Sequence, residues 1–220
     1  MEQRVRETLR YLGYGKHSVD ESTLHLISES FEKLDTMKRE RFVYRFFEVE
    51  QVEENILQID SIQIKSKDLS KNLTGCTRCA IFVATLGVEI DTYIRKCTML
   101  DMAKAVILQA CAATLMEELC DHIEDTIREE VRKEYMQKEY MQKEYMQKER
   151  IQRERIQRED IQKENMRLKP RFSAGYGDLN IAYQEQILAI VEAQKKIGVT
   201  LTDSFMMVPT KSVTAFVGIQ

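Results

Sequence analysis

Residues 79–87, with the sequence CAIFVATLG, are the stretch on which the fold depends. The run is continuously apolar or small and closes with Gly87, as is typical of a strand buried on both faces. Such a strand lies in the middle of a sheet, because each of its faces needs a covering layer. We therefore expect the segments on either side of it to supply further strands and the helices that cover them.

The segments before this strand predict two helices and two more strands. Residues 4–14 carry apolar side chains at helical spacing, and Ser18 with Glu21 resembles a capping box at the start of a second helix. The segment RFVYRFFEVEQV, at 41–52, is rich in aromatic and β-branched residues. ILQIDSIQI, at 56–64, alternates with one slip, so we expect two adjacent strands with room for a bulge.

The segment after this strand predicts one long helix. From Asp101 onward the pattern is helical, and between Ala103 and Met116 almost every residue is apolar or small, which indicates a core helix. The later turns keep one apolar row, and the opposite side becomes charged. The row consists of Ile107, Cys111, Leu115, Leu119, Ile123, Ile127 and Val131. We therefore expect the helix to leave the core as it proceeds.

Residues 133–167 form an internal repeat of pentads: KEYMQ three times, then KERIQ, RERIQ, REDIQ and KENMR. An apolar residue in every pentad advances about 140° around a helix per repeat, so these residues spiral and form no coiled-coil seam. Each Glu precedes a Lys or Arg on the same face, which stabilises a solvated helix by about 0.3 kcal/mol per pair. We expect a protruding charged helix without chemistry of its own, the alternative being an arm that binds a partner.

The C-terminal part returns to loop, helix and strands. Pro170 ends the long helix, and the loop RFSAGYGD follows at 171–178. A further helix is expected around 180–197, and the segments VTLTDSFMMVP, at 199–209, and SVTAFVGI, at 212–219, read as strands. Val213, Ala215, Val217 and Ile219 share one face of the last strand.

The order of helices, strands, helices and strands predicts an α+β fold. We expect a twisted antiparallel sheet with flanking helices and one long, protruding charged helix. Residues 1–220 are enough for a single domain with a real core, and the pentads at 133–167 are expected to be a helical insertion within it.

Composition narrows the classes of partner. A formal net charge of -3 gives no general attraction to nucleic acid or to an anionic membrane. No apolar run approaches the roughly 18 residues of a membrane helix, so we expect a cytoplasmic protein with reduced thiols. The CTRC pair, Cys76 and Cys79, has no second pair that would complete a zinc site, and His17, His25 and His122 are too scattered for a catalytic triad.

Two motifs separated by one helix carry a family resemblance. They are RFSAGYGD and GVTLTDSFMMVPTKSVTAF, at 171–178 and 198–216. In order, they supply Arg171, Gly175, Tyr176, Leu201, Thr202, Ser204, Met207, Pro209, Ser212 and Val213. This pattern resembles the activation domain of cobalamin-dependent methionine synthase, which has an Arg-X-X-X-Gly-Tyr loop, a helix, and a Leu-Thr-Glu-Ser-X-X-Met-X-Pro segment followed by Ser-Val. The long helix also looks like the family's central helix, so the resemblance spans roughly residues 80–217.

The resemblance implies a function. Domains of this family bind S-adenosylmethionine and present it to oxidised cobalamin, with a one-electron donor such as flavodoxin completing a reductive methylation. The sequence contains no Asp-X-His-X-X-Gly corrinoid motif. We therefore expect a stand-alone activation subunit that has no turnover alone and acts on a partner, a methionine synthase subunit that carries the cobalamin.

Carried over by position, the ligand contacts are Glu117, Arg171, Ser173, Gly175 and Tyr176. A guanidinium can fork onto the ligand carboxylate, and a helix-borne carboxylate balances its ammonium and sulfonium charges. Gly175 lets the backbone approach the ligand, and Tyr176 offers a ring or a hydroxyl. Glu117 is expected to interrupt a small, apolar helix face as a buried carboxylate that needs a partner.

The sequence departs from the family at two places. The family often continues its Gly-Tyr loop with Pro-Ala-Cys-Pro, where this chain has Gly177, Asp178 and Leu179, and Asp203 replaces the expected Glu. Two alternatives stay open: a reactivation factor for another corrinoid methyltransferase, and a helical interaction protein with a vestigial pocket. A self-sufficient, doubly wound methyltransferase would need a glycine-rich loop after its first strand, and none is present near the amino terminus.

Overall fold

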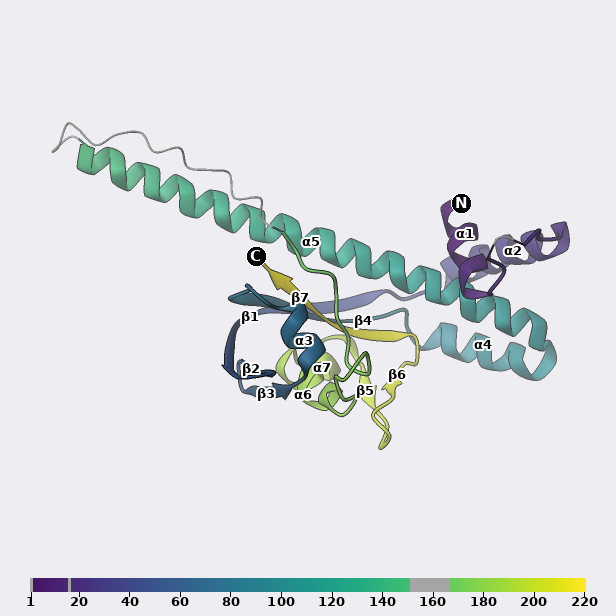
Figure 1. Cartoon of the computed structure of the whole chain (residues 1–220). Helices are drawn as coiled ribbons and strands as arrows, with labels where there is room; N and C mark the ends of the chain where they lie inside the picture. The colour runs from purple at the N-terminus through teal and green to yellow at the C-terminus, as the bar shows by residue number, and fades with distance from the viewer. Residues whose placement is uncertain (1, 16, 151–166) are drawn as a thin grey trace.

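The computed structural model of the chain describes residues 2–15, 17–150 and 167–220. Five antiparallel strands form the main sheet in the order β3-β2-β1-β4-β7, and two short strands form a separate pair. The strands are β1 (Arg41–Glu53), β2 (Ile56–Ile59), β3 (Ile62–Lys65), β4 (Arg78–Thr85), β5 (Thr200–Leu201), β6 (Met207–Val208) and β7 (Ser212–Ile219). The helices are α1 (Glu2–Tyr11), α2 (Glu21–Met37), α3 (Lys67–Asn72), α4 (Val88–Leu100), α5 (Met102–Arg150), α6 (Tyr183–Ile190) and α7 (Ala193–Ile197). The predicted α+β fold with an antiparallel sheet and one long helix is confirmed (Figure 1).

Strand β4 has the central position that its sequence predicts. It pairs with β1 on one side and β7 on the other, and every residue from Cys79 to Thr85 is buried. Its side chains alternate between two hydrophobic cores. Ala80, Phe82 and Ala84 face the first core, and Cys79, Ile81 and Val83 face the second.

The first core lies between the sheet and helices α1, α2, α4 and α5. The predicted apolar row of α5 is confirmed, because all seven of its members, from Ile107 to Val131, are at most 9% exposed. Burial of a Leu or Ile side chain contributes about 2 kcal/mol, so this row is a main source of the attachment of α5 to the sheet and to the helices around it. The helix continues far beyond the sheet, as Figure 1 shows.

The second core lies on the opposite face of the sheet. Helices α3, α6 and α7 cover it together with the β2–β3 hairpin (Figure 1). Phe216 of β7 and Ile59 of β2 are fully buried there, as are Ile187 of α6 and Val199. The predicted face of β7 is also confirmed, since Ala215, Val217 and Ile219 are buried in the first core and Val213 packs against it.

The segment 56–64 is a hairpin, and the prediction of a single strand there is wrong. Strands β2 and β3 pair with each other and turn at Asp60, which has a positive φ of 52°. The slip in alternation at Asp60 and Ser61 is therefore the turn itself. The expected irregularity is found instead in β1, where the register shifts between Gln51 and Glu53.

Three other boundaries differ from the sequence prediction. The N-cap of α2 is Asp20 and not Ser18, because the Asp20 carboxylate accepts the backbone N–H of Thr23 at 2.8 Å. The segment 180–197 is two helices, divided where Glu192 adopts a left-handed φ of 58°. In 199–209 only β5 and β6 are extended, and the residues between them form a turn. Helix α4 was not predicted as a separate element.

The first pentads continue α5 as helix up to Arg150, and residues 151–166 lie outside the described residues. The predicted Glu–Lys pairs within the repeat likewise involve side chains outside the described part. Among the helices that the structure describes, none combines the length and the apolar character needed to cross a membrane.

Candidate functional site

We call residues 167–179 the strap, and its first part, residues 167–172, runs along the outer edge of β7. Backbone hydrogen bonds join Arg167 to Gln220, Lys169 to Gly218 and Phe172 to Phe216, with N···O distances of 2.8–3.0 Å. Bridges at Leu168 and Phe172 give the strap an antiparallel direction relative to β7. Pro170 has no N–H to donate and is exposed between these two bridges. The strap is therefore held to the sheet on both sides of this proline.

The side chain of Arg171 reaches from the strap to helix α5. Its guanidinium donates hydrogen bonds to Glu117, to Asp121 at 2.8 Å and to Glu124 at 2.5 Å. The three carboxylates are four and then three residues apart, so they lie on one face of the helix. Arg171 therefore fixes the strap to α5 through three charge-assisted contacts.

Burial alone would lower the pKa of Arg171, since its side chain is only 26% exposed. The hydrogen bonds to Glu124, Asp121 and Glu117 outweigh this effect, and the pKa is raised. Three carboxylates face one guanidinium, so the cluster keeps two negative charges. An excess of negative charge at a partly buried position favours a cationic ligand.

The structure brings together two of the five predicted contact residues, Arg171 and Glu117. The expectation that Glu117 is a buried carboxylate on an apolar face is wrong, because its side chain is 48% exposed. Val106, on the same line of the helix, is 51% exposed, whereas Ala110 and Cys120 on that line are buried, so this face of α5 is only partly covered. Glu117 is paired with a cation all the same, and that cation is Arg171.

The other three predicted residues form a tight turn two residues beyond Arg171. The backbone N–H of Tyr176 donates to the carbonyl of Ser173 at 3.1 Å, and Gly175 has a φ of 89°. A positive φ at the third position is what a type II turn requires, which explains the glycine. The ring of Tyr176 is 74% exposed and meets Phe172 edge-on, with 6.4 Å between the ring centroids.

The sequence prediction missed Asp121 and Glu124, although their helical spacing from Glu117 could have indicated them. It also missed Tyr11, at the end of α1. This helix packs on α5 through a buried hydrogen bond between Thr8 and Thr114, with 3.0 Å between the hydroxyl oxygens. Burial raises the pKa of Tyr11, and the charge of Glu117 raises it further. Tyr11 therefore belongs to the surroundings of the site.

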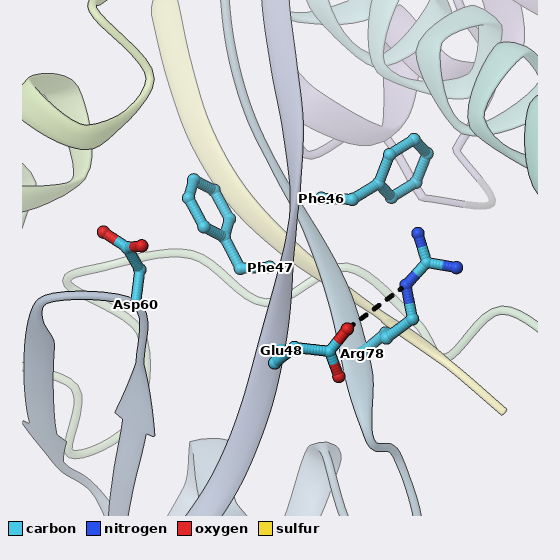
Figure 2. Close-up of a pocket in the computed structure, with 5 residues that line it drawn as sticks. All are labelled: Phe46, Phe47, Glu48, Asp60 and Arg78. Carbon is cyan, nitrogen blue, oxygen red and sulfur yellow. Dashed lines mark ion pairs between the residues drawn. The ribbon is translucent and has the colours of Figure 1, made fainter.

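Two cavities lie away from the Arg171 cluster. One, of about 300 Å³, is lined by residues of β1, β4 and the β2–β3 turn; Figure 2 shows Phe46 and Phe47 on opposite sides of β1 and the ion pair between Arg78 and Glu48. The other, of about 890 Å³, lies between α6, α7 and β5. Neither is lined by any of the five predicted contact residues.

The CTRC pair is packed inside the protein. Cys76 is 9% exposed and Cys79 is fully buried, and both are free thiols. Burial raises the pKa of Cys79 to about 12, which leaves it protonated and unreactive at neutral pH. Among the described residues no group of three or more His, Cys, Asp or Glu side chains has the arrangement of a metal site.

Comparison with known proteins gives the family. The sequence model of the family described as "Vitamin B12 dependent methionine synthase, activation domain" matches residues 30–220. The chain belongs to this family. A comparison with curated protein sequences finds no match.

A solved structure of the MetH reactivation domain bound to AdoHcy is similar in fold. The TM-score is 0.59 and the sequence identity is 18%; the match covers 93% of this chain and 67% of the other. The family resemblance carried by the two motifs is therefore confirmed by the family model, and the predicted fold by the solved structure.

Proposed function

We propose that the chain binds S-adenosylmethionine where the strap meets α5 and supplies the methyl donor for reductive remethylation of inactivated cobalamin in methionine synthase. The cobalamin is carried by a partner protein, and a one-electron donor such as flavodoxin provides the electron. Membership of the activation-domain family supports the methionine synthase reaction. The AdoHcy in the similar structure supports the class of ligand.

The observation that carries the proposal is the contact between Arg171 and Glu117. The two residues are separated by the whole repeat in the sequence, and the family resemblance predicts both as ligand contacts. The cluster around them has two excess negative charges. S-adenosylmethionine carries a sulfonium, an ammonium and a carboxylate, so its net positive charge is complementary to the cluster.

In this proposal each residue contacts a different group of the ligand. Arg171 pairs with the ligand carboxylate, for which its guanidinium releases part of its contact with the acids of α5. Glu117 then balances the ligand ammonium. The turn from Ser173 to Tyr176 brings small side chains and backbone to the ligand, and the exposed Tyr176 ring can cover it. These groups bind and orient the donor, and the cobalamin of the partner supplies the nucleophile that accepts the methyl group.

The direct test is calorimetric titration of the protein with S-adenosylmethionine. We expect binding to the wild type and a loss of about 1.5 kcal/mol or more, roughly tenfold in affinity, for Arg171→Ala. Arg128→Ala is the matched control, because Arg128 lies on α5 and its ion pair among the described residues is with Asp125, one turn earlier on the helix. Equal affinities in the wild type and Arg171→Ala would remove Arg171 from the site, and no binding to the wild type would refute the function.

We propose that residues 1–220 act as one module, with the pentads of 133–167 as an insertion in it, and that the module works in the cytoplasm.

The partner is tested by reconstitution. A cobalamin-loaded methionine synthase without its activation domain, an electron donor and S-adenosylmethionine are mixed with the chain. Methylcobalamin formation, followed by absorbance, is expected only with the chain present. Formation with a different corrinoid methyltransferase instead would identify that enzyme class as the partner.

A further inference from the structure

The C-terminal end of the strap is attached to helix α3 through one carboxylate. Asp178 accepts the backbone N–H groups of Lys67 at 2.7 Å and Asp68 at 3.1 Å. The hydroxyl of Ser66 donates a further hydrogen bond to it. These bonds, with that from Ser66 first, lower the pKa of Asp178. Asp178 thus satisfies free N–H groups at the start of α3 from outside that helix.

Ser66 connects this contact to the helix itself. It is the N-cap of α3, and its hydroxyl oxygen accepts the backbone N–H of Leu69 at 3.0 Å. The same hydroxyl gives its hydrogen to Asp178. Because the donor and acceptor sides of the hydroxyl are both engaged, Asp178 and the first turn of α3 hold one another in a fixed orientation.

The neighbouring glycine shows how closely the two segments approach. Gly177 has a φ of 54°, and a Cβ atom placed on it would lie 2.3 Å from the Asp68 carboxylate. The backbone N–H of Asp178 also donates to that carboxylate at 3.3 Å. Gly177 and Asp178 are two of the positions at which this chain departs from the pattern of the family that it resembles. The departure therefore coincides with a specific contact in this chain.

The turn from Ser173 to Tyr176 lies between two attachments. Arg171 joins the strap to α5 on one side of it, and Asp178 joins the strap to α3 on the other. We propose that Asp178 is a positioning residue, which sets the turn for S-adenosylmethionine through the first turn of α3 without touching the ligand. This inference rests on the proposed function and adds α3 to the parts of the chain that determine affinity.

The test compares the affinity for S-adenosylmethionine of Asp178→Ala, Asp178→Asn and Ser66→Ala with that of the wild type. Asp178→Ala removes all three acceptor contacts, and we expect a loss of about tenfold, the scale of one charge-assisted hydrogen bond. Asp178→Asn keeps one acceptor oxygen and is expected to retain part of the affinity. Asp60→Asn is the matched control, since Asp60 is exposed and its carboxylate accepts hydrogen bonds from the neighbouring Ser61.

Hydrogen exchange separates positioning from a general loss of stability. In the wild type we expect S-adenosylmethionine to slow exchange in residues 66–70, although the ligand does not contact them. In Asp178→Ala this response should be lost, while the exchange of β4 and the response of the strap persist. A double-mutant cycle of Asp178→Asn with Ser66→Ala is expected to be non-additive, because the two side chains share a bond.

The outcomes distinguish the two proposals. A wild type that does not bind S-adenosylmethionine overturns the proposed function and this inference with it. Binding to the wild type with an equal affinity in Asp178→Ala overturns the inference alone. So does a ligand response in residues 66–70 that persists after the substitution.

Discussion

Arg171 is the side chain that joins the strap to the core helix, and its surroundings explain how it can be both fixed and available. Of its three carboxylate partners, Glu124 is only 17% exposed, whereas Glu117 and Asp121 are 48% and 68% exposed. Exposed ion pairs contribute little to stability. Breaking a partly buried pair costs more, because it leaves a charge without its partner. A ligand can therefore compete for Arg171 at Glu117 and Asp121 while Glu124 keeps the strap in place.

A second prediction at the scale of single residues concerns the effect of Gly175 on stability. We expect Gly175→Ala to destabilise the protein by about 1–3 kcal/mol in urea unfolding, because alanine is strained at a φ of 89°. The nearest atom to an added Cβ is Ile181 Cδ1 at 3.7 Å, so the cost is one of backbone conformation and not of space. Gly175→Asn should cost less, since asparagine tolerates this position of a type II turn. A smaller loss for alanine than for asparagine would contradict the explanation.

The residues of the candidate site could be predicted only in part from the sequence. The motif gave Arg171 and the turn that follows it, and the resemblance gave Glu117. The full set of α5 residues that the strap contacts could not be predicted from the sequence. The pentad repeat separates the two segments and fixes no distance between them. Asp178 was seen as a departure from the family pattern, but its role depends on α3, a helix of six residues with no clear periodicity.

At the scale of elements, helix α5 contacts both the sheet and three other helices. The buried row of α5 packs against β4 and β7, and α1, α2 and α4 pack around the same helix. Strand β4 and this row were predictable, because a continuous apolar run and a row of apolar residues at helical spacing indicate burial whatever the rest of the fold is. The division of the segment 183–197 into two helices was not predictable. It depends on the left-handed conformation of Glu192, which the pattern of apolar residues does not indicate.

The row itself can be tested by truncation. Ile123 is fully buried, and we expect Ile123→Ala to lower the free energy of unfolding by about 3 kcal/mol, since a cavity remains in the core. Val106→Ala on the exposed face of the same helix is the control, with an expected change within about 0.5 kcal/mol. Similar losses for the two variants in chemical denaturation would show that the row does not carry the attachment.

Tyr44 connects β1 to α5 and gives the attachment a pH dependence. Its hydroxyl donates a hydrogen bond to Glu130, and burial, followed by this bond, raises the pKa of Tyr44 to about 12. The pKa in the unfolded chain is about 10. The folded value is the higher one, so this stabilisation is complete below pH 10 and is lost as the pH rises through 12.

We therefore expect the melting temperature of the wild type to fall more steeply than that of Tyr44→Phe between about pH 10 and about pH 12. Phenylalanine keeps the ring and has no proton to lose. Parallel curves for the two proteins in that range would contradict the assignment.

At the scale of the whole molecule, the two ends of the pentad repeat lie close to one another at one end of the sheet. Glu134, near the point where α5 passes the sheet, contacts Arg78 at 3.0 Å. Arg78 pairs with Ile219 across the sheet, and Arg167, at the start of the strap, bonds to the adjacent Gln220. Both ends of the repeat thus lie at the end of β4, and we expect that the rest of the fold does not depend on the length of the repeat.

Replacing residues 138–166 with a short Gly-Ser linker should leave the S-adenosylmethionine affinity within about twofold of the wild type. The melting temperature should change by only a few degrees, because the described contacts between α5 and the sheet end at Glu134. Calorimetry and a thermal melt check both points. Retained ligand affinity with lost binding to the cobalamin-bearing partner would show that the repeat is a docking arm.

The hydrogen bonds of the strap to β7 have a consequence for solubility. Strand β7 is the last of its sheet, and a free strand edge offers unpaired N–H and C=O groups to any other extended chain. Arg167, Lys169 and Phe172 occupy those groups in the folded protein. A proteolytic cut that releases residues 167–172 would therefore expose a template for edge-to-edge association, and the clipped protein would tend to aggregate through its own β7.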